Sequence, residues 1–188
     1  MKQAKVLNEA EMKRLLAVID AGRHAPRNRL AVMLSYLAGM RVGEIAALKV
    51  GDVFDSDGKV RDQIRLKASY TKGNEARTVF VGSKLAKELT RFRASMPSAS
   101  PEGPLLQTQK GTAFSANTLC QLCGTLYKRA GSMGGSSHSG RRSFITKLAH
   151  SGVSAKVIMT LAGHKHLSTT QRYIDVNDEM LRKAVELA

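Results

Sequence analysis

The stretch Leu161–Tyr173, LAGHKHLSTTQRY, is the most informative part of this chain of 188 residues for its fold and its candidate site. It places His164 directly after an apolar helical run. Nine residues later, beyond the polar Ser168-Thr169-Thr170, comes Tyr173 with Arg172 beside it. Neighbouring cations or a histidine can favour the phenolate of a tyrosine in a transition state. Tyr173 is therefore a candidate nucleophile.

Three upstream segments contain further candidate site residues. Arg41 lies in GMRVGE, Lys72 lies in YTKGNEARTVFV, and HSGRRSF contains both His138 and Arg141. Arginine suits a phosphodiester, because its planar guanidinium stays charged and donates two parallel hydrogen bonds. Attack on phosphorus spreads more negative charge over the equatorial oxygens. Positioned cations of this kind are the main requirement for such a reaction.

Together these segments resemble the tyrosine recombinases, the phage-integrase family of site-specific DNA recombinases. The likeness runs from about residue 7 to about residue 176, with the segments in the family's order. It implies the tyrosine recombinase catalytic-domain fold, which is α+β, predominantly α-helical, with a small antiparallel β-sheet. It also implies a single catalytic domain over residues 1–188. Its C-terminal helix, from about residue 178, is expected to dock on a neighbouring protomer; the alternative is that it folds back on its own chain.

The resemblance assigns a role to each candidate residue. Tyr173 is expected to attack the scissile phosphate, forming a 3′-phosphotyrosyl link and a free 5′-hydroxyl. Arg41 and Arg141 would clamp the non-bridging oxygens, and Lys72 would protonate the leaving 5′-oxygen. Two histidines would hydrogen-bond a phosphate oxygen and exchange protons near neutral pH: His138 and His164. Since one phosphodiester replaces another, no ATP, metal or other cofactor is expected.

Neighbouring side chains receive different interpretations. Glu44, three residues after Arg41 on a helix, is expected to brace that arginine. Arg142 is interpreted as surface charge or a backbone-phosphate contact, because the family pattern places the arginine three residues after the histidine. Lys67 competes with Lys72 for the general-acid role, since either could reach the site from the same hairpin.

Composition favours nucleic acid as the partner. Lys and Arg total 30 against 15 Asp and Glu, giving a net charge of +15, while 43% of the residues are hydrophobic. Such a chain folds around a core and presents a cationic surface. Double-stranded DNA is expected, and the resemblance implies a homo-oligomer, a tetramer, assembled on it. A membrane partner is disfavoured, because no helix sets a purely basic face against bulky apolar residues.

The sequence also predicts a cytoplasmic protein. No apolar run approaches the ~20 residues that span a bilayer, and the N-terminus lacks the apolar core of a signal peptide. The cysteines Cys120 and Cys123 are expected to be small buried side chains on a helix. A zinc site that added His164 and His166 to them would not match the usual finger spacings.

Hydrophobic periodicity predicts helices over most of the chain. The first is expected to begin with a capping box formed by Asn8 and Glu11, and the second to begin at Pro26 and stop near Gly39. Further helices are expected at about 42–48, 85–92, 115–126, 144–152, 154–163 and 178–188. Alternating residues from Val60 to Leu66 and the run from Thr78 to Val81 predict a β-hairpin, with Lys72 at or near its tip.

Two features depart from the family pattern. Most members carry a separate N-terminal helical domain that grips the opposite face of the duplex, and no room for one precedes the first segment. We expect either a catalytic fragment or a minimal recombinase that holds DNA from one side. Gly140 also stands where a bulky apolar residue usually precedes the arginine. This predicts a lost packing anchor and a less rigid Arg141.

Other functions remain open from the sequence alone. A type IB topoisomerase uses the same nucleophile but religates the same strand, although the compact spacing from His164 to Tyr173 favours a recombinase or integrase of a mobile element. A DNA-binding regulator of the same fold would not need every catalytic position filled. A basic RNA-binding protein would explain none of the spacings.

Overall fold

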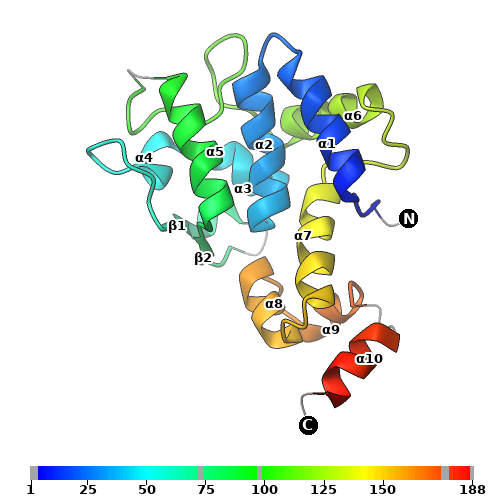
Figure 1. Ribbon diagram of the computed structural model, residues 1–188. Coiled ribbons are helices and arrows are strands. Elements are labelled where there is room, and N and C mark those ends of the chain that lie inside the picture. The colour runs from blue at the N-terminus through cyan, green and yellow to red at the C-terminus, as the bar shows by residue number, and fades with distance from the viewer. Residues whose placement is uncertain (1–3, 72–73, 97–98, 175–177, 187–188) are drawn as a thin grey trace.

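The computed structural model describes residues 4–71, 74–96, 99–174 and 178–186, and it is mainly helical (Figure 1). The elements in chain order are α1 (Glu9–Asp20), α2 (Ala25–Ala38), α3 (Val42–Ala47), α4 (Val50–Val53), β1 (Gln63–Leu66), η1 (Ala68–Tyr70), β2 (Arg77–Phe80), α5 (Ser83–Ala94), α6 (Ala116–Arg129), α7 (Ser139–His150), α8 (Ala155–Ala162), α9 (Leu167–Gln171) and α10 (Asp178–Val185). The strands form a two-stranded antiparallel sheet. The predicted fold class is confirmed.

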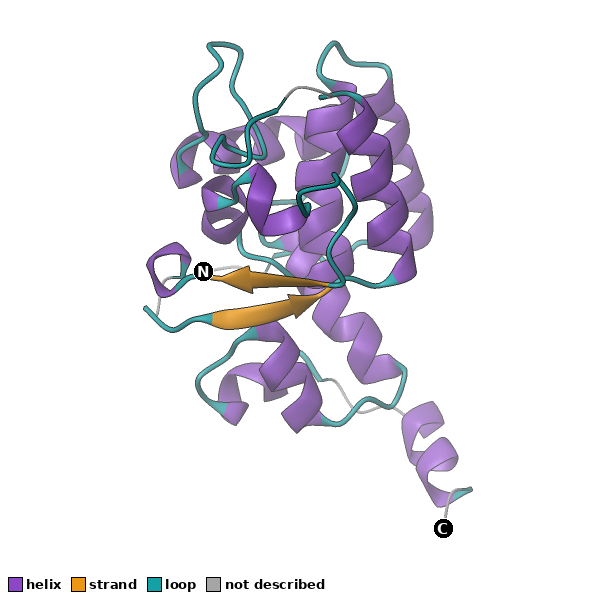
Figure 2. Cartoon of the chain, turned by 90° about the vertical axis from the view of Figure 1, so that its left-hand side faces the viewer, coloured by secondary structure: helices purple, strands orange, loops and turns teal. Residues whose placement is uncertain are grey.

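The helices form two groups that α7 connects (Figure 1). The larger, upper group contains α1, α2, α5 and α6, and the lower group contains α8, α9 and α10. The two strands lie between these groups, as Figure 2 shows from the side. The junction therefore brings together segments that are far apart in the sequence.

The hairpin shows the predicted alternation between its two faces. Ile64 pairs with Val79, and Leu66 pairs with Arg77. Ile64 and Leu66 are both 0% exposed, because this face of the sheet covers the core. Arg77 consequently lies at the loop end of β2, close to the junction. Lys72, predicted at the hairpin tip, lies outside the described residues.

The signals that predicted helix ends are confirmed. At α1, Asn8 Oδ1 accepts a hydrogen bond from the Glu11 N–H at 2.8 Å, and Glu11 Oε2 accepts one from the Asn8 N–H at 3.2 Å. Gly39 ends α2 with φ 61°, and Gly163 ends α8 with φ 64°. Glycine adopts this left-handed conformation without a Cβ penalty, so both helices stop where the sequence indicates.

Two short α-helices, α4 and α9, were not predicted from the sequence, and neither was the 3-10 helix η1. The sequences of α4 and α9, VGDV and LSTTQ, contain glycine, valine and threonine, which are weak helix formers. Helices this short depend on tertiary packing rather than on propensity. Within α9, Thr170 is 0% exposed, which shows the packing that stabilises this turn.

Helix α2 lies between two parts of the core. Leu30 and Leu34 pack into the cluster that also contains residues of α3, β1, β2 and α5. Val32 and Met33 pack into a second cluster with α1 and α6. A third, smaller cluster joins α7 to α8 in the lower group. Because α2 is buried on more than one side, it provides a rigid base on which α7 rests.

Gly140 allows α7 to approach α2 closely, which contradicts the expectation of a lost packing anchor. A Cβ added at this glycine would lie 2.9 Å from Ser35 Oγ and 3.0 Å from Ser35 Cβ. The following residue, Arg141, is only 5% exposed and is held by two backbone carbonyls. Arg141 is therefore firmly placed by the close contact between the helices.

This contact predicts the effect of Gly140→Ala. The added methyl group would force α7 away from α2, and overpacking of this kind typically costs about 1–3 kcal/mol. Chemical denaturation should therefore show a lower free energy of unfolding. Gly124→Ala on α6 is the matched control, because its added Cβ meets nothing within 4 Å. That control should be neutral or stabilising by up to about 1 kcal/mol; equal losses in both variants would contradict the close-approach explanation.

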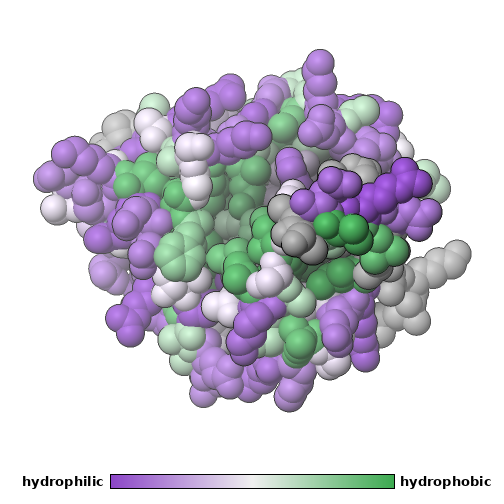
Figure 3. Space-filling view, turned by 60° about the horizontal axis from the view of Figure 1, so that its bottom comes forward, coloured by the Kyte–Doolittle hydropathy of each residue, from purple (hydrophilic) through white to green (hydrophobic). Residues whose placement is uncertain are grey.

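Figure 3 shows apolar side chains gathered near the middle of the lower face, with polar ones around them. In the described ranges, no helix has the length and apolarity needed to cross a membrane.

Cys120 and Cys123 are free thiols on α6, and burial raises the pKa of Cys123 to about 12. Cys123 is thus a small buried side chain, as expected, whereas Cys120 is only half-buried.

Candidate active site

Arg41 lies at the N-terminus of α3, directly after the turn that ends α2. Its Nη1 donates to Glu44 Oε1 at 2.9 Å, and its backbone N–H donates to Glu44 Oε2 at 2.8 Å. Its Nη2 donates to the carbonyl of Gly163 at 2.9 Å. The predicted bracing of Arg41 by Glu44 is confirmed. The side chain remains 30% exposed, so part of the guanidinium is open to a ligand.

Arg77 is a site residue that the sequence did not reveal. Its Nη2 donates to Glu44 Oε2 at 2.6 Å, and its Nε donates to Glu44 Oε1 at 3.2 Å. Its Nη1 donates to the carbonyl of Leu161 at 2.9 Å. Glu44, 1% exposed, thus accepts hydrogen bonds from two guanidinium groups. Arg77 joins the hairpin to the arginine cluster.

Arg141 approaches the same point from α7. Its Nη1 donates to the carbonyl of Gly39 at 2.5 Å, and its Nη2 donates to that of Ala162 at 2.7 Å. Burial, together with the charges of Arg41 and Arg77, lowers the pKa of Arg141 to about 9. The guanidinium therefore still carries its charge at neutral pH, in a place where it is shielded from water.

The three arginines meet at the C-terminal end of α8. Successive carbonyls there, those of residues 161, 162 and 163, accept hydrogen bonds from Arg77, Arg141 and Arg41 respectively. The last carbonyls of a helix lack partners within it and carry the negative end of the helix dipole. The end of α8 consequently gathers three positive charges from three distant segments into one site.

His164 lies just beyond this helix end and is 9% exposed. Its Nδ1 is 2.9 Å from Thr170 Oγ1, which leaves Nε2 as the ring nitrogen that can meet a ligand. Burial, then the charges of Arg141, Arg41 and Arg77, lower the pKa of His164 to about 4. The imidazole is therefore neutral at physiological pH and can serve as a hydrogen-bond donor or acceptor.

Tyr173 follows α9 and is half-buried against the cluster between α7 and α8. Its ring stacks on the His164 ring, with centroids 5.7 Å apart and planes inclined by 21°. The Arg142 guanidinium carbon lies 5.5 Å from the centroid of the same ring. Arg142 is thus half-buried against Tyr173, which differs from the surface charge expected from the sequence.

A cavity of about 300 Å³ opens beside these groups. Its walls include Arg41, Arg77 and His164. On its rim, Lys165 Nζ forms an ion pair with Glu75 Oε1 at 2.8 Å. The cavity therefore presents two guanidinium groups and an imidazole to any anion that enters it.

The remaining candidate residues are Lys72, its alternative Lys67, and His138. Lys72 lies outside the described residues, but Thr71 and Glu75, on either side of it in the chain, both line the cavity. Lys67, the other candidate for the general acid, has its Nζ 5.9 Å from the centroid of the Tyr70 ring, with which it forms a cation–π contact. His138 is exposed at the N-terminus of α7, and its ring forms no hydrogen bond with any described residue.

The paired arginines at Glu44 predict a pH-dependent stability. Burial alone would raise the pKa of Glu44, but the hydrogen bond and charge of Arg77, with those of Arg41, hold it below its ordinary value of 4.5. A lowered folded-state pKa stabilises the protein above the unfolded value and loses this effect as the pH falls. Glu44→Gln should lower the free energy of unfolding at pH 7 by about 3–5 kcal/mol, because the largely buried Arg77 loses its counter-charge and the partly exposed Arg41 loses one as well.

Denaturation of both proteins across a pH series would test this. The gap between wild type and Glu44→Gln should narrow as the pH falls through 4.5 and below, where the wild-type carboxylate is protonated as well. Glu88→Gln is a useful control, since Glu88 pairs with Arg29 away from this site. A gap that stays constant with pH would contradict the assigned charge of Glu44.

Comparisons with known proteins identify the family of this chain. A model of the "Phage integrase family" matches residues 5–180. Tyrosine recombinase XerA of Thermococcus kodakarensis is 39% identical over 187 residues, covering 98% of this chain and 62% of that protein. The chain thus spans less than two thirds of this relative's length.

Solved structures share the fold. The crystal structure of XerA recombinase superposes with a TM-score of 0.75 at 27% identity, covering 100% of this chain and 66% of the other. XerH site-specific recombinase, bound to a palindromic difH substrate, superposes with a TM-score of 0.71 at 25% identity, covering 98% of this chain and 53% of the other. From the family match and the XerA identity, the chain belongs to the phage integrase family.

Proposed function

We propose that this chain is the catalytic domain of a site-specific DNA recombinase or integrase that cuts DNA through Tyr173. The observation that carries the proposal is the convergence of Arg41, Arg77, Arg141 and His164 at the end of α8, with the Tyr173 ring stacked on the histidine. A site rich in fixed cations suits the negative charge that develops during attack on a phosphodiester. Tyr173 is assigned as the nucleophile because its ring contacts both His164 and the guanidinium of Arg142.

In the proposed reaction, the phenolic oxygen of Tyr173 attacks phosphorus and the bond to the 5′-oxygen breaks. The phenol loses one proton and the leaving 5′-oxygen gains one, so the step is balanced without any co-reactant. Arg41 and Arg141 are assigned to the non-bridging oxygens, and His164 Nε2 to one of them. The products are a 3′-phosphotyrosyl adduct and a free 5′-hydroxyl, and strand exchange follows when another 5′-hydroxyl attacks the adduct.

Protonation of the leaving oxygen is assigned to Lys72. This lysine follows Thr71 in the chain, and Thr71 lines the same cavity as Arg41 and Arg77. The ammonium group of lysine can reach a substrate on a flexible chain and can act as an acid when nearby cations favour its neutral form. His138, one turn before Arg141, is assigned to the same phosphate once DNA is bound.

Double-stranded DNA is the proposed partner. The net charge of +15 gives the surface an attraction for the phosphate backbone. The relative XerH is a site-specific recombinase whose structure was solved bound to its difH substrate. By this likeness, the cavity beside α8 would receive one phosphate of a duplex.

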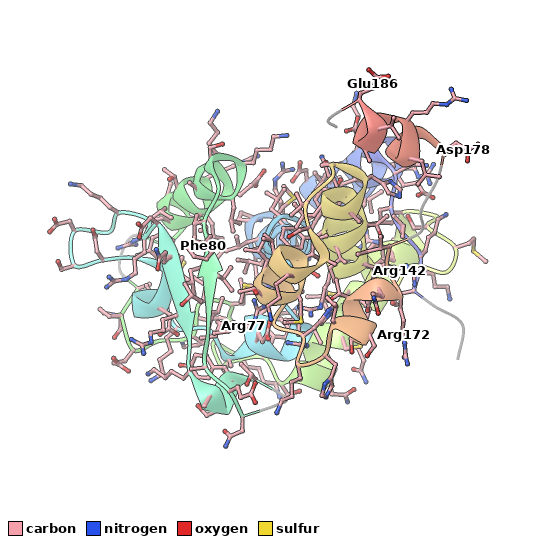
Figure 4. The ribbon with its side chains drawn as sticks, turned by 90° about the horizontal axis from the view of Figure 1, so that it is seen from below. Arg77, Phe80, Arg142, Arg172, Asp178 and Glu186 are labelled. Atoms are coloured by element: carbon pink, nitrogen blue, oxygen red, sulfur yellow. The ribbon has the colours of Figure 1, made fainter. Side chains whose placement is uncertain are left out.

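A homo-oligomer on DNA, a tetramer, is also proposed. The face of α10 with Leu181 and Val185, which are 56% and 73% exposed, needs a partner. We assign it to an apolar groove on another copy, lined by Met33, Leu37, Phe144 and Leu148 among others. Glu9 and Glu88 also line this groove, together with three lysines of α5 and α7. Those lysines would complement the acidic ends of α10, at Asp178 and Glu186 (Figure 4). The contact is head-to-tail, so it closes into a ring only when the DNA sets the geometry.

Deletion of residues 178–188 should prevent this assembly without preventing DNA binding. Analytical ultracentrifugation on a duplex would show multimers for the full chain and separate monomers for the truncated one. The double variant Leu181→Ser/Val185→Ser should behave like the deletion, because it removes the apolar contact area alone. Unchanged assembly after the deletion would reject the exchange of α10.

The proposed function can be tested without a known target site. The protein is incubated, in EDTA and without ATP, with a pool of nicked duplexes of randomised sequence, and SDS-resistant protein–DNA adducts are recovered and sequenced. We expect the protein to be linked to the 3′ end of the broken strand, with a free 5′-hydroxyl on the other end, and we expect the adducts to be enriched for one sequence. A chain that binds the pool but forms no adduct would be a non-cleaving DNA-binding protein, and the proposal would fail. Supercoiled plasmid that is relaxed without strand exchange would instead identify a topoisomerase.

A further inference from the structure

Two adjacent arginines on α7 have separate environments. Arg141 is 5% exposed and its guanidinium is bound by two backbone carbonyls. Successive residues of a helix point about 100° apart, so Arg142 faces a different neighbour. Its guanidinium carbon lies 5.5 Å from the centroid of the Tyr173 ring. Figure 4 shows Arg142 beside α9, whereas Arg77 lies beside α8.

No carboxylate of the described residues forms a salt bridge with Arg142. Its Nε is buried and forms no hydrogen bond with any described residue. The side chain as a whole is half-buried, and the partner that its guanidinium contacts is an aromatic ring. The contact is thus specific to Tyr173 rather than one part of a larger ion-pair network.

The Tyr173 ring contacts both His164 and Arg142. His164 stacks on the ring, and the Tyr173 backbone N–H donates to the carbonyl of Thr170 at 2.9 Å. Within the described chain, the hydroxyl forms no hydrogen bond. We infer that Arg142 is a positioning residue for the nucleophile: it holds the Tyr173 ring by a cation–π contact and stabilises the negative charge that the ring gains during attack. This inference rests on the proposed function.

The contact should matter more in the transition state than before it. As the phenol loses its proton, negative charge spreads from the oxygen into the ring, and the attraction to a cation over the ring increases. Only interactions that strengthen in the transition state accelerate the chemical step. Arg142 therefore differs from Arg41 and Arg141, which are assigned to the phosphate.

The test compares cleavage by Arg142→Met and Arg142→Lys with wild type, in single turnover at saturating protein. Arg142→Met keeps the apolar stem but removes the charge, and a loss of about 3- to 30-fold in cleavage rate is expected from the size of cation–π interactions. Arg142→Lys should recover part of that rate, because an ammonium can also lie over a ring. Arg172→Met is the matched control, since it removes the same charge beside the same tyrosine from an exposed position.

Slower cleavage by Arg142→Met could reflect an effect on the nucleophile or on protonation of the leaving group. A substrate with sulfur in place of the bridging 5′-oxygen separates these two explanations. Its thiolate leaves without needing a proton, so it rescues variants that fail to protonate the leaving group. The loss in Arg142→Met should persist with this substrate, because Arg142 acts on the nucleophile. Rescue by sulfur would overturn the inference, and so would equal cleavage by Arg142→Met and Arg172→Met.

A second measurement does not depend on cleavage. Protons of the Arg142 side chain should show ring-current shifts in NMR spectra, and Tyr173→Leu should abolish them. Shifts that are absent from the wild type would reject the contact itself. Failure of the proposed function is seen separately, as a wild-type protein that forms no adduct in spite of these shifts.

Discussion

Tyr173→Phe should form no covalent adduct with DNA while still binding it. The substitution removes only the attacking oxygen, and removal of a catalytic nucleophile lowers rates by factors that reach about 10⁶. The fold should be unaffected, because the hydroxyl forms no hydrogen bond within the described residues and the ring contacts with His164 and Arg142 are retained. The free energy of unfolding should then change by less than about 0.5 kcal/mol. SDS gels of trapped adducts and thermal unfolding give the two readouts.

The other tyrosines provide the controls for this experiment. Burial raises the pKa values of Tyr36, Tyr70 and Tyr127, which makes each a poorer nucleophile. Tyr36→Phe, on α2, should therefore cleave at the wild-type rate. An adduct that survives in Tyr173→Phe and disappears in one of the other variants would move the nucleophile and remove the basis of the proposed mechanism.

The sequence predicted those parts of the site that depend on local signals. The left-handed Gly163 ends α8 where an apolar run meets glycine, and this exposes the carbonyls that the arginines bind. The bracing of Arg41 by Glu44 follows from their spacing of three residues on a helix. Both features are set within a few residues, so a single sequence is sufficient to find them.

The missed features depend on contacts between distant segments. Arg77 looked like an ordinary strand residue, because its partners Glu44 and Leu161 are 33 and 84 residues away. The role of Gly140 depends on Ser35 of another helix, and the ring contact of Arg142 depends on where α9 places Tyr173. One signal was available for Arg77: it lies two positions before Val79, on the same face of β2, at the loop end nearest Lys72 in the chain.

The end of α8 explains why these distant residues converge. The N–H groups of Gly163 and His164 bond to carbonyls of the preceding turn, at residues 159 and 160. This leaves the next three carbonyls for Arg77, Arg141 and Arg41. The same turn positions His164 for its contact with Tyr173. A helix end that satisfies its own carbonyls with arginines thereby orients positive charge for a phosphate before any ligand arrives.

Arg41→Ala should separate catalysis from stability at this site. Loss of one preorganised donor to a developing negative charge typically costs about 10²–10³-fold in rate. Stability should change little, because Glu44 keeps its two hydrogen bonds from Arg77 at 2.6 and 3.2 Å, and Arg41 itself is 30% exposed. Arg77→Ala should mainly lower stability. Its side chain is 10% exposed, and breaking a buried ion pair costs about 3–5 kcal/mol in the free energy of unfolding.

Single-turnover cleavage and denaturation of the two variants would reveal this difference. Arg41→Lys should remain well below the wild-type rate, because an ammonium cannot reproduce the two-pronged hydrogen bonding of a guanidinium. Arg65→Ala, which removes an exposed charge on β1, controls for general loss of DNA attraction and should cleave normally. If Arg41→Ala cleaved as fast as Arg65→Ala, the exposed part of the Arg41 guanidinium would have no role at the phosphate. The arginines around α8 would then serve to hold the hairpin and α7 together, and the clamp on the phosphate would have to be formed by Arg141 without Arg41.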